Sequence, residues 1–152
     1  MEFKDYAYLI TALIGLLTFI KALREYIING RQKKIELLNK YRDKFQNEQF
    51  FTEINPLIEN DSKDLQKISR LKRYYYLGFF EEISILMNSR VLKAEIIHYF
   101  FGYYSILTKK SSNFWFDINR DSFYWKEFNN FVEKMKKIEN KKETNINKRI
   151  KV

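Results

Sequence analysis

Apolar residues are arranged in two different ways along this chain. From Tyr6 to Ile20 they form a run of 15 residues that carries no formal charge and has no polar face when placed on a helix. Beyond about residue 60, apolar residues instead recur every three or four positions between charged ones, which is typical of amphipathic helices. The pattern predicts an all-α chain with a single N-terminal transmembrane helix and a small antiparallel helical cytosolic domain.

The uncharged run is short for a helix that spans a membrane. As an α-helix it rises about 22 Å, whereas the hydrocarbon core of a bilayer is roughly 30 Å thick. Two further turns close the gap, because Lys21 and Arg24 can extend and place their charges among the lipid headgroups. Tyr6 and Tyr26 would lie at the two interfaces, which such rings prefer. We therefore predict that residues 1–28 form an N-terminal transmembrane anchor.

Other interpretations of this run stay open. A cleavable secretory signal would need a cationic start and a small-residue cleavage site, whereas Glu2 and Asp5 precede the run and no A-x-A pattern follows it. A buried helix of a soluble protein could also be apolar on all sides. Thr11 and Gly15 form a small-xxx-small pair, which would allow anchors to associate as a dimer or a pore.

The charges beside the run predict its orientation. Glu25 is the only acidic residue in the stretch 21–34, which also contains five basic residues. These basic residues, which we expect to flank the membrane, are Lys21, Arg24, Arg31, Lys33 and Lys34. Because loops rich in Lys and Arg stay in the cytoplasm, we predict a single-pass protein of the cell membrane with its N-terminus outside and its C-terminal domain cytoplasmic.

The rest of the chain divides into three parts. Residues 29–54 are predicted to form a juxtamembrane stalk helix, and both continuity and a break at Gly30 are open. Residues 55–139 are predicted to form the helical cytosolic domain. Residues 140–152 are polar and basic with few apolar residues, so they are predicted to be a disordered tail.

Three helices are predicted within the domain. The first extends from Lys63 to about Asn88. After a short turn the second extends from Lys93 to Leu107, so that the two form an antiparallel αα-hairpin. The third begins near Asp121. Their predicted core positions are, in order, Leu65, Ile68, Leu71, Tyr75, Phe79, Ile83 and Leu86; Ile96, Ile97, Phe100, Tyr103 and Leu107; and Trp125, Phe128, Phe131 or Val132, Met135 and Ile138.

Composition narrows the possible functions. The chain has no Cys, which excludes disulfides, thiolate catalysis and cysteine metal sites. Four Gly and one Pro are too few for the turns of a β-sheet protein. The net charge is +9, and residues 109–152 contribute +6 of it, from 12 basic and 6 acidic residues. Such a C-terminal part could bind nucleic acid or anionic lipid, and charge alone does not choose between them.

No pair or cluster of residues predicts a reaction. Glu81 and Glu82 are adjacent, so on a helix they point about 100° apart and cannot serve one cleft as acid and base. His98 is the only histidine and lacks the further ligands of a metal site. Common motifs of serine hydrolases, P-loop proteins, dinucleotide-binding proteins and zinc proteases are absent. We predict a protein that is not an enzyme, with no cofactor and no metal.

One stretch combines basic and aromatic residues as a nucleic-acid surface does. Two cations precede three consecutive tyrosines between residues 72 and 76. On a helix these five residues point in different directions, and Tyr75 belongs to the predicted core face. The candidate basic and aromatic surface therefore consists of Lys72, Arg73, Tyr74 and Tyr76.

The same region resembles a known family. Tyr74–Ile83, with the sequence YYYLGFFEEI, is followed by Val91-Leu92 and then by an aromatic-Gly-aromatic run at Tyr99–Tyr104. This order is similar to that of an uncharacterised bacterial family, a domain of unknown function that pairs an N-terminal membrane helix with a small helical cytosolic domain. The resemblance covers roughly residues 60–135 and implies that architecture, but no activity. Gly78 departs from the family pattern, which has a polar residue there.

These patterns lead to one expected function and one alternative. We expect a single-pass membrane-anchored helical protein whose cytosolic domain mediates protein–protein interaction, as a scaffold, a sensor or a membrane-acting effector. Its partners would be the lipid bilayer and either another protein or a second copy of this chain. The alternative is a membrane-tethered module that binds nucleic acid or a nucleotide ligand through a basic surface.

Overall fold

The chain is helical throughout the part that the structure describes. The computed structural model describes the backbone of residues 3–150 and the side chains of residues 6, 8 and 10–141. No strand occurs over residues 3–150, which confirms the predicted all-α class. The chain divides into Met1–Lys40, which we call unit 1, and Tyr41–Val152, which we call unit 2.

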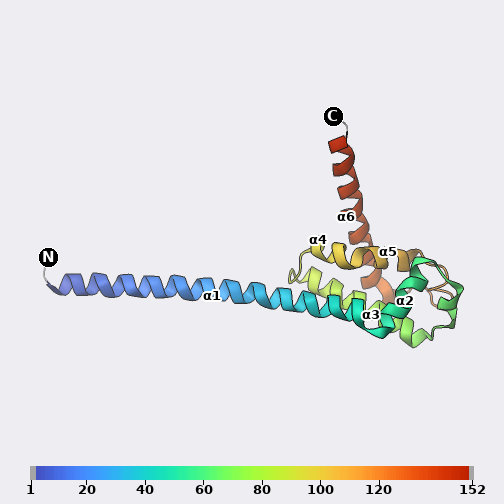
Figure 1. The fold of residues 1–152 in the computed structure, drawn as a ribbon, viewed down its shortest axis with the longest axis horizontal. Coiled ribbons are helices and arrows are strands. Elements are labelled where there is room, and N and C mark those ends of the chain that lie inside the picture. Colours follow the sequence, from blue (N-terminus) through green and yellow to red (C-terminus); the bar gives the residue numbers. More distant parts are fainter. Residues whose placement is uncertain (1–2, 151–152) are drawn as a thin grey trace. The chain divides into compact units, whose positions relative to one another are not determined.

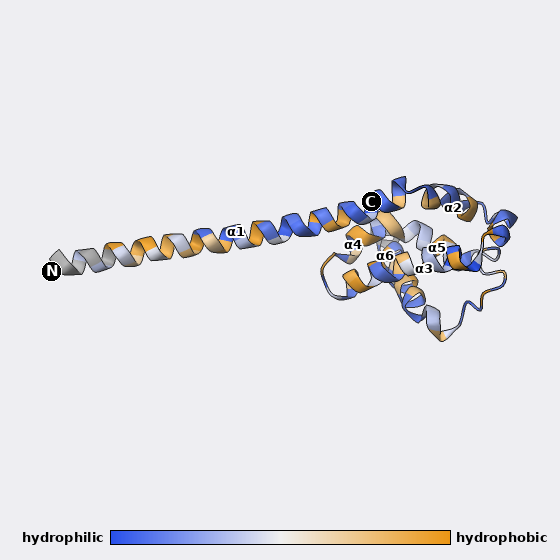
Figure 2. Cartoon of the chain, turned by 90° about the horizontal axis from the view of Figure 1, so that it is seen from below, coloured by the Kyte–Doolittle hydropathy of each residue, from blue (hydrophilic) through white to orange (hydrophobic). Residues whose placement is uncertain are grey.

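Unit 1 consists of a single helix over its described residues. Helix α1 spans Phe3–Asn47, so it begins in unit 1 and its last turns belong to unit 2 (Figure 1). It continues through Gly30 without the break that the sequence left open. Figure 2 shows that hydrophobic residues prevail in the N-terminal part of α1, after the residues drawn in grey, and that hydrophilic residues follow.

The predicted transmembrane helix is not supported by the structure. Among the residues described, no helix is both long enough and apolar enough to cross a membrane. The physical reason is that Lys21, Arg24 and Glu25 interrupt the apolar sequence soon after Ile20. Part of the predicted anchor, namely the side chains of residues 1–5, 7 and 9, lies outside the described residues.

Unit 2 contains the remaining helical segments. The longer helices are α2 (Gln49–Glu59), α3 (Arg70–Asn88), α5 (Tyr103–Lys110) and α6 (Lys126–Ile150). The short ones are η1 (Lys63–Lys67), α4 (Ala94–Ile97), η2 (His98–Gly102) and η3 (Phe123–Trp125). Helix α3 packs mainly against α6, whereas α5 packs against both α2 and α6. The core of unit 2 therefore lies between α3, α5 and α6, with α2 and the end of α1 beside them.

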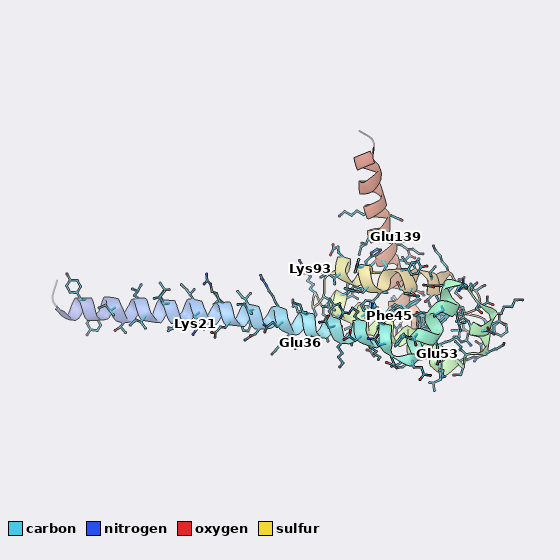
Figure 3. The ribbon with its side chains drawn as sticks, viewed as in Figure 1. Lys21, Glu36, Phe45, Glu53, Lys93 and Glu139 are labelled. Atoms are coloured by element: carbon cyan, nitrogen blue, oxygen red, sulfur yellow. The ribbon has the colours of Figure 1, made fainter. Side chains whose placement is uncertain are left out.

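Aromatic rings make up much of this core, and Phe45 connects α1 to it. Phe45 is 4 % exposed and is labelled in Figure 3. Its ring stacks on Phe79 with a centroid distance of 5.2 Å and meets Phe101 edge to face at 5.6 Å. Such ring pairs stabilise a core beyond the area that they bury. The compact unit begins at Tyr41, before the predicted border at residue 55, and includes the last turns of α1 and all of α2.

The stalk helix ends earlier than predicted, and α2 follows it. The long helix ends at Asn47, and α2 then contains Pro56 in its interior. Asn55, just before the proline, is buried and accepts a hydrogen bond of 2.7 Å from the hydroxyl of Tyr76. Residues 29–54 are thus divided between two helices rather than forming one stalk.

The predicted helix from Lys63 is divided as well, and its buried face differs from the predicted one. Residues 63–67 form the short helix η1, and Ser69 then caps α3 by accepting a hydrogen bond from the backbone N–H of Lys72. The division does not change which residues of α3 share a face. Of the predicted core positions, Leu65, Phe79 and Ile83 are buried, whereas Leu71 and Tyr75 are exposed. The buried positions of α3 are Arg73, Tyr76, Leu77, Phe79, Phe80, Ile83, Ser84 and Met87.

The predicted second helix contains a π-helical turn at His98–Gly102, between α4 and α5. A π-helical turn holds more residues than an α-helical turn, so it shifts every side chain that follows. Ile97 is buried as predicted, but Phe101 and Ile106 are buried where the pattern predicted Phe100 and Tyr103. Tyr103 is 58 % exposed. The core face was therefore wrong after the π-helical turn.

The predicted face of the last helix is largely confirmed. Phe128, Phe131, Val132 and Met135 are all 0 % exposed on α6. The backbone of α6 is helical through Ile150, so the predicted disordered tail from residue 140 differs from the structure up to that residue. Residues 151 and 152 lie outside the described residues.

Candidate functional site

Many apolar side chains of α1 in unit 1 are exposed. Leu, Ile and Phe side chains between residues 10 and 28 are 42–66 % exposed. They are Ile10, Leu13, Ile14, Leu16, Leu17, Phe19, Ile20, Leu23, Ile27 and Ile28. Figure 3 shows side chains projecting on both sides of the helix along this stretch, including around Lys21. The apolar surface therefore surrounds the helix instead of forming one stripe.

The basic residues that we predicted to flank a membrane are all exposed. They are Lys21, Arg24, Arg31, Lys33 and Lys34. Lys21 forms an ion pair with Glu25 at 3.9 Å, but the two side chains are 79 % and 62 % exposed. An exposed pair of this kind contributes little to stability, so these cations can meet other anions.

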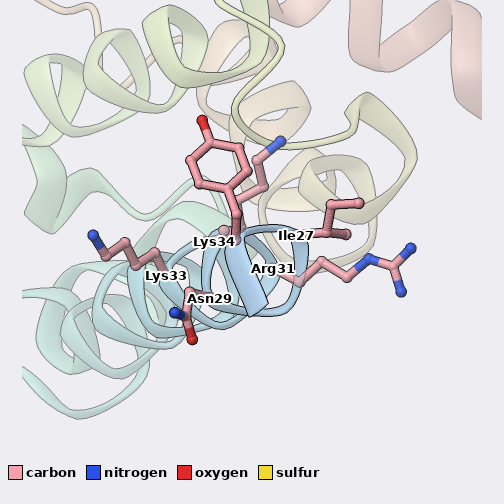
Figure 4. Close-up of a pocket in the computed structure, with 7 residues that line it drawn as sticks. Ile27, Asn29, Arg31, Lys33 and Lys34 are labelled. Atoms are coloured by element: carbon pink, nitrogen blue, oxygen red, sulfur yellow. The ribbon is translucent and has the colours of Figure 1, made fainter. Parts of the chain in front are cut away.

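A hollow of about 620 Å³ beside residues 26–34 does not form a binding site. All of its lining residues come from one stretch of α1, between Tyr26 and Lys34. Figure 4 shows the side chains of Ile27, Arg31 and Lys33 pointing away from the helix in different directions. A ligand there would contact only the outside of a single helix, so we assign no site to this hollow.

The candidate basic and aromatic surface is only half exposed. Lys72 and Tyr74 are exposed, as a surface role requires. Arg73 and Tyr76 are 1 % and 0 % exposed, so the prediction was wrong for these two residues. Both residues belong to the face of α3 that packs in the core, together with Leu77 and Phe80. Burial also raises the pKa of Tyr76 well above its usual value.

Arg73 is a buried cation whose hydrogen bonds are all made within unit 2. Its Nε donates to the carbonyl oxygen of Ile68 at 3.1 Å, and Nη1 donates to that of Phe114 at 2.6 Å. Its Nη2 donates to the Asp117 carboxylate, whose other oxygen accepts from Arg70 Nε at 2.7 Å. Hydrogen bonding from Arg70, and then from Arg73, lowers the pKa of Asp117. The two arginines thus hold the loop after α5 against the start of α3.

Glu81 and Glu82 contact different elements and do not form an acid–base pair. Glu81 accepts a hydrogen bond from the backbone N–H of Phe128 in the first turn of α6. Partial burial raises the pKa of Glu81, and the nearby Glu127 adds to that effect, while the bond from Phe128 opposes it. Glu82 accepts a hydrogen bond of 3.2 Å from the hydroxyl of Tyr41. Their contacts are consistent with roles in joining helices.

A second hollow, also of about 620 Å³, lies between the start of α3 and the segment that leads into α6. We call it the Tyr124 hollow. It is lined among others by Arg70, Tyr74, Asp117, Asn119, Tyr124 and Trp125. Residues far apart in the sequence thus meet here on two sides of one concave surface. Its volume lies within the range of small-molecule sites, about 300–1,000 Å³.

The aromatic residues of the Tyr124 hollow differ in how firmly they are held. The rings of Tyr74 and Trp125 meet with centroids 5.0 Å apart, and Trp125 also meets Trp115 at 6.3 Å. Tyr124 is 82 % exposed, and the adjacent Phe123, which does not line the hollow, is 80 % exposed. The hollow therefore has one wall of packed rings and one ring exposed to solvent.

The structure also shows the surroundings of His98. His98 begins the π-helical turn and lies against Gly102, where an added Cβ would come within 2.9 Å of the imidazole Cδ2. Within the described part of the chain, no three His, Asp or Glu side chains are grouped as a metal site would require. Gly102 therefore allows close contact between this ring and the helix backbone.

Sequence reasoning missed the Tyr124 hollow because its residues come from two distant segments. Arg70 belonged to the middle of a predicted helix, and Trp125 was assigned to the core. The exposed aromatic pair at Phe123 and Tyr124, just after Ser122, was the signal that could have indicated a surface site. It could not have indicated which residues lie opposite.

Comparison with known proteins assigns neither a family nor a function to this chain. No protein-family model, no curated protein and no solved structure matches the chain. The resemblance to a bacterial family of unknown function therefore stays a prediction, and the functional proposals depend on the residues and contacts described above.

Proposed function

We propose that this protein is anchored in a membrane through the N-terminal part of α1, and that unit 2 is a module for protein–protein interaction. The observation that carries the proposal is the exposure, at 42–66 %, of Leu, Ile and Phe side chains between Ile10 and Ile28. A helix that stays in water keeps a polar face, and this stretch has apolar residues on all sides. A bilayer would remove that surface from water.

The charges on α1 support the position of the anchor. Apolar length alone is not sufficient for a crossing over the described residues, so the proposal depends on the reach of Lys21 and Arg24 to the headgroups. Arg31, Lys33 and Lys34 then lie beyond the membrane surface, where anionic lipids attract cations. The same charges favour a cytoplasmic position for unit 2.

Exposed apolar residues on unit 2 support an interaction role. Leu71 is 78 % exposed near the start of α3, and Phe116 is 63 % exposed in the loop that follows α5. Phe123 and Tyr124 are also at least 80 % exposed. When many apolar residues are exposed together on a surface, they are characteristic of a site that binds another protein. A second protein or a second copy of this chain would cover them.

Fractionation tests the anchor with a matched pair of variants. The full chain is expected in the membrane fraction and released only by detergent. Leu13→Lys combined with Leu17→Lys places two charges in the apolar stretch and should move the chain to the soluble fraction, because each charge is costly in a bilayer. Leu71→Lys changes a leucine of unit 2 that is also exposed, at 78 %, and should leave the chain in the membrane. Recovery of the unaltered chain without detergent would contradict the anchor.

The absence of cysteine allows a direct test of orientation. A single cysteine introduced at the exposed Lys126 of α6 should be protected in intact cells from a maleimide that cannot cross membranes. Permeabilised cells should become labelled. Labelling in intact cells would place unit 2 outside and overturn the proposed orientation.

Detergent-solubilised chain tests the interaction role. Chemical cross-linking of the full chain should give a defined product with a partner protein or with itself. The combined change Leu71→Ser and Phe123→Ser should reduce that product, whereas Lys63→Ser, at an exposed position of η1, should not. A cross-linking pattern that none of these changes affects would argue against an interface at this end of unit 2.

A further inference from the structure

Three of the residues that line the Tyr124 hollow carry aromatic rings that a planar ligand could contact. Tyr74 and Trp125 form the packed wall, with ring centroids 5.0 Å apart. Tyr124, which also lines the hollow, is 82 % exposed. Leaving such a ring in water is unfavourable compared with covering it. A flat aromatic ring that entered between Tyr124 and this wall would stack on one and contact the other.

The charged residues that line the hollow are Arg70 and Asp117. Asp117 lines the hollow, but its carboxylate is already held by Arg70 and by the buried Arg73. Arg73 does not line the hollow, so the formal charges of the lining cancel. Asp121 lies 3.7 Å from Lys109 Nζ and does not line the hollow either. Because two arginines already hold Asp117, an anionic ligand would find its partner in Arg70.

Arg70 is the group that can meet such an anion. Only its Nε is bound to Asp117, at 2.7 Å, and its side chain is 58 % exposed. A guanidinium group has further N–H donors in a planar fork that matches carboxylates and phosphates. Since Asp117 fixes one side of this fork, the group is already oriented when a ligand arrives.

We propose that the Tyr124 hollow binds a small ligand in which a planar aromatic ring is joined to an anionic group, with a nucleoside monophosphate as the representative chemistry. The ring lies between Tyr124 and the wall of Tyr74 and Trp125, and the phosphate meets Arg70. This site is separate from the membrane anchor, so it can be tested whether or not the anchor is correct.

Binding is measured on the full chain in mild detergent. Trp125 lines the hollow, so AMP should quench the tryptophan fluorescence in a saturable way, and equilibrium dialysis should give the same affinity. Adenosine and inorganic phosphate each supply one half of the ligand and should bind at least about tenfold more weakly. Absence of AMP binding at millimolar concentration, or adenosine binding as tightly as AMP, would overturn the proposal.

Two neighbouring aromatic residues provide a matched pair of variants. Tyr124→Ala should weaken AMP binding about tenfold, within the range found for loss of a stacked ring. Phe123→Ala removes an equally exposed ring that does not line the hollow and should change the affinity less than twofold. Both side chains are at least 80 % exposed, so thermal unfolding should show that neither change disturbs the fold. An equal loss in both variants would overturn the assignment.

A second pair tests the anion contact. Arg70→Ala should weaken AMP binding about tenfold and leave adenosine binding unchanged, because only the phosphate meets this residue. Lys67→Ala removes a nearby cation that pairs with Asp64 at 2.7 Å and lies outside the hollow, so AMP should bind as before. If the chain binds an RNA oligonucleotide but no mononucleotide, the hollow is not a small-ligand site and the proposal fails.

Discussion

Two leucines, each in the interior of a helix, show that the same type of side chain is exposed in unit 1 and buried in unit 2. Leu17 in α1 is 58 % exposed, whereas Leu77 in α3 is 0 % exposed. Both belong to helices rich in apolar residues, yet α3 has polar residues on one side and meets α6 with the other. Apolar character therefore predicts that a side chain prefers to leave water, but not what will cover it.

This comparison separates two sources of stability. Residues of unit 2 bury one another, so substitutions there should alter a cooperative unfolding transition. The described part of unit 1 is a single helix, whereas most helical stability in proteins comes from packing of an apolar face against other elements. Its apolar side chains should affect where the protein resides rather than how stably unit 2 folds.

The largest expected effect comes from opening a cavity in the core of unit 2. Phe80 is 0 % exposed and its ring contacts those of Phe128 and Phe131 in α6 at 5.8 and 6.0 Å. Phe80→Ala should lower the free energy of unfolding by about 3–5 kcal/mol. Urea unfolding followed by near-ultraviolet circular dichroism measures this change.

The control for this prediction lies in unit 1. Leu17→Ala also removes apolar atoms, but from an exposed side chain, so the same transition should shift by less than about 0.5 kcal/mol. Equal destabilisation by the two substitutions would show that the units unfold together, and the distinction drawn here would fail.

The next largest effect on stability is expected from two arginines that bind the same carboxylate. Arg73 is 1 % exposed and Arg70 is 58 % exposed, and both bind Asp117. Arg73→Met leaves the carbonyl groups of Ile68 and Phe114 without their donor and should cost about 3 kcal/mol. Arg70→Met removes an exposed partner and should cost about 1 kcal/mol or less. Thermal or urea unfolding of both variants measures the difference, and equal costs would contradict the role of burial.

Sequence patterns predicted those helices of unit 2 in which nothing interrupts the period. The face of α6 was predicted because Phe128, Phe131 and Met135 follow one continuous helix. In α3 the apolar residues Leu71 and Tyr75 are exposed, so apolar character alone did not mark the buried face. The face of the next helix failed at the π-helical turn of His98–Gly102, which shifts the phase. Such a turn does not change hydrophobicity, so a hydrophobic period does not reveal it.

The candidate site was harder to predict than the fold. Arginine is usually found on protein surfaces, so nothing in the sequence indicated that Arg73 is buried. Its burial depends on Asp117 and on the carbonyl group of Phe114, which lie more than 40 positions away. The Tyr124 hollow likewise joins Arg70 to Trp125 across a loop whose path is not encoded by periodicity. Of the residues that line the hollow, Tyr74 is the one that belonged to the basic and aromatic surface predicted from the sequence.

Acid should destabilise unit 2 through a turn that depends on one carboxylate. Partial burial raises the pKa of Asp61, but hydrogen bonds from Ser111, Asn113 and Ser112 lower it by more, so the net pKa is lowered. Above the ordinary value of about 3.9, Asp61 is ionised in both states and its contribution is fully present. As the pH falls below that value, the unfolded state takes up a proton first and the contribution is lost.

Asp61→Asn tests this dependence. Asparagine tolerates the left-handed conformation of Asp61, whose φ is 42°, so the backbone of the turn is kept. The variant should lose about 1–2 kcal/mol at neutral pH, since an amide accepts fewer hydrogen bonds than a carboxylate. Its stability should also fall less than that of the unaltered chain between pH 5 and pH 3. A variant with the full acid response would show that other carboxylates are responsible.

The smallest expected effect on stability comes from replacing helical glycines by alanine. Three glycines can be compared, and one of them lies in unit 1. A Cβ at Gly78 or Gly30 would meet nothing within 4 Å, whereas a Cβ at Gly102 would come within 2.9 Å of His98 Cδ2. Gly78→Ala should therefore stabilise unit 2 by up to about 1 kcal/mol, through higher helix propensity, and Gly102→Ala should destabilise it by a similar amount. Gly30→Ala gains the same propensity at a position of α1 that lies outside unit 2, so it should leave the unfolding midpoint unchanged. If Gly30→Ala stabilises unit 2 as much as Gly78→Ala does, then α1 contributes to the fold of unit 2 over more than its last turns.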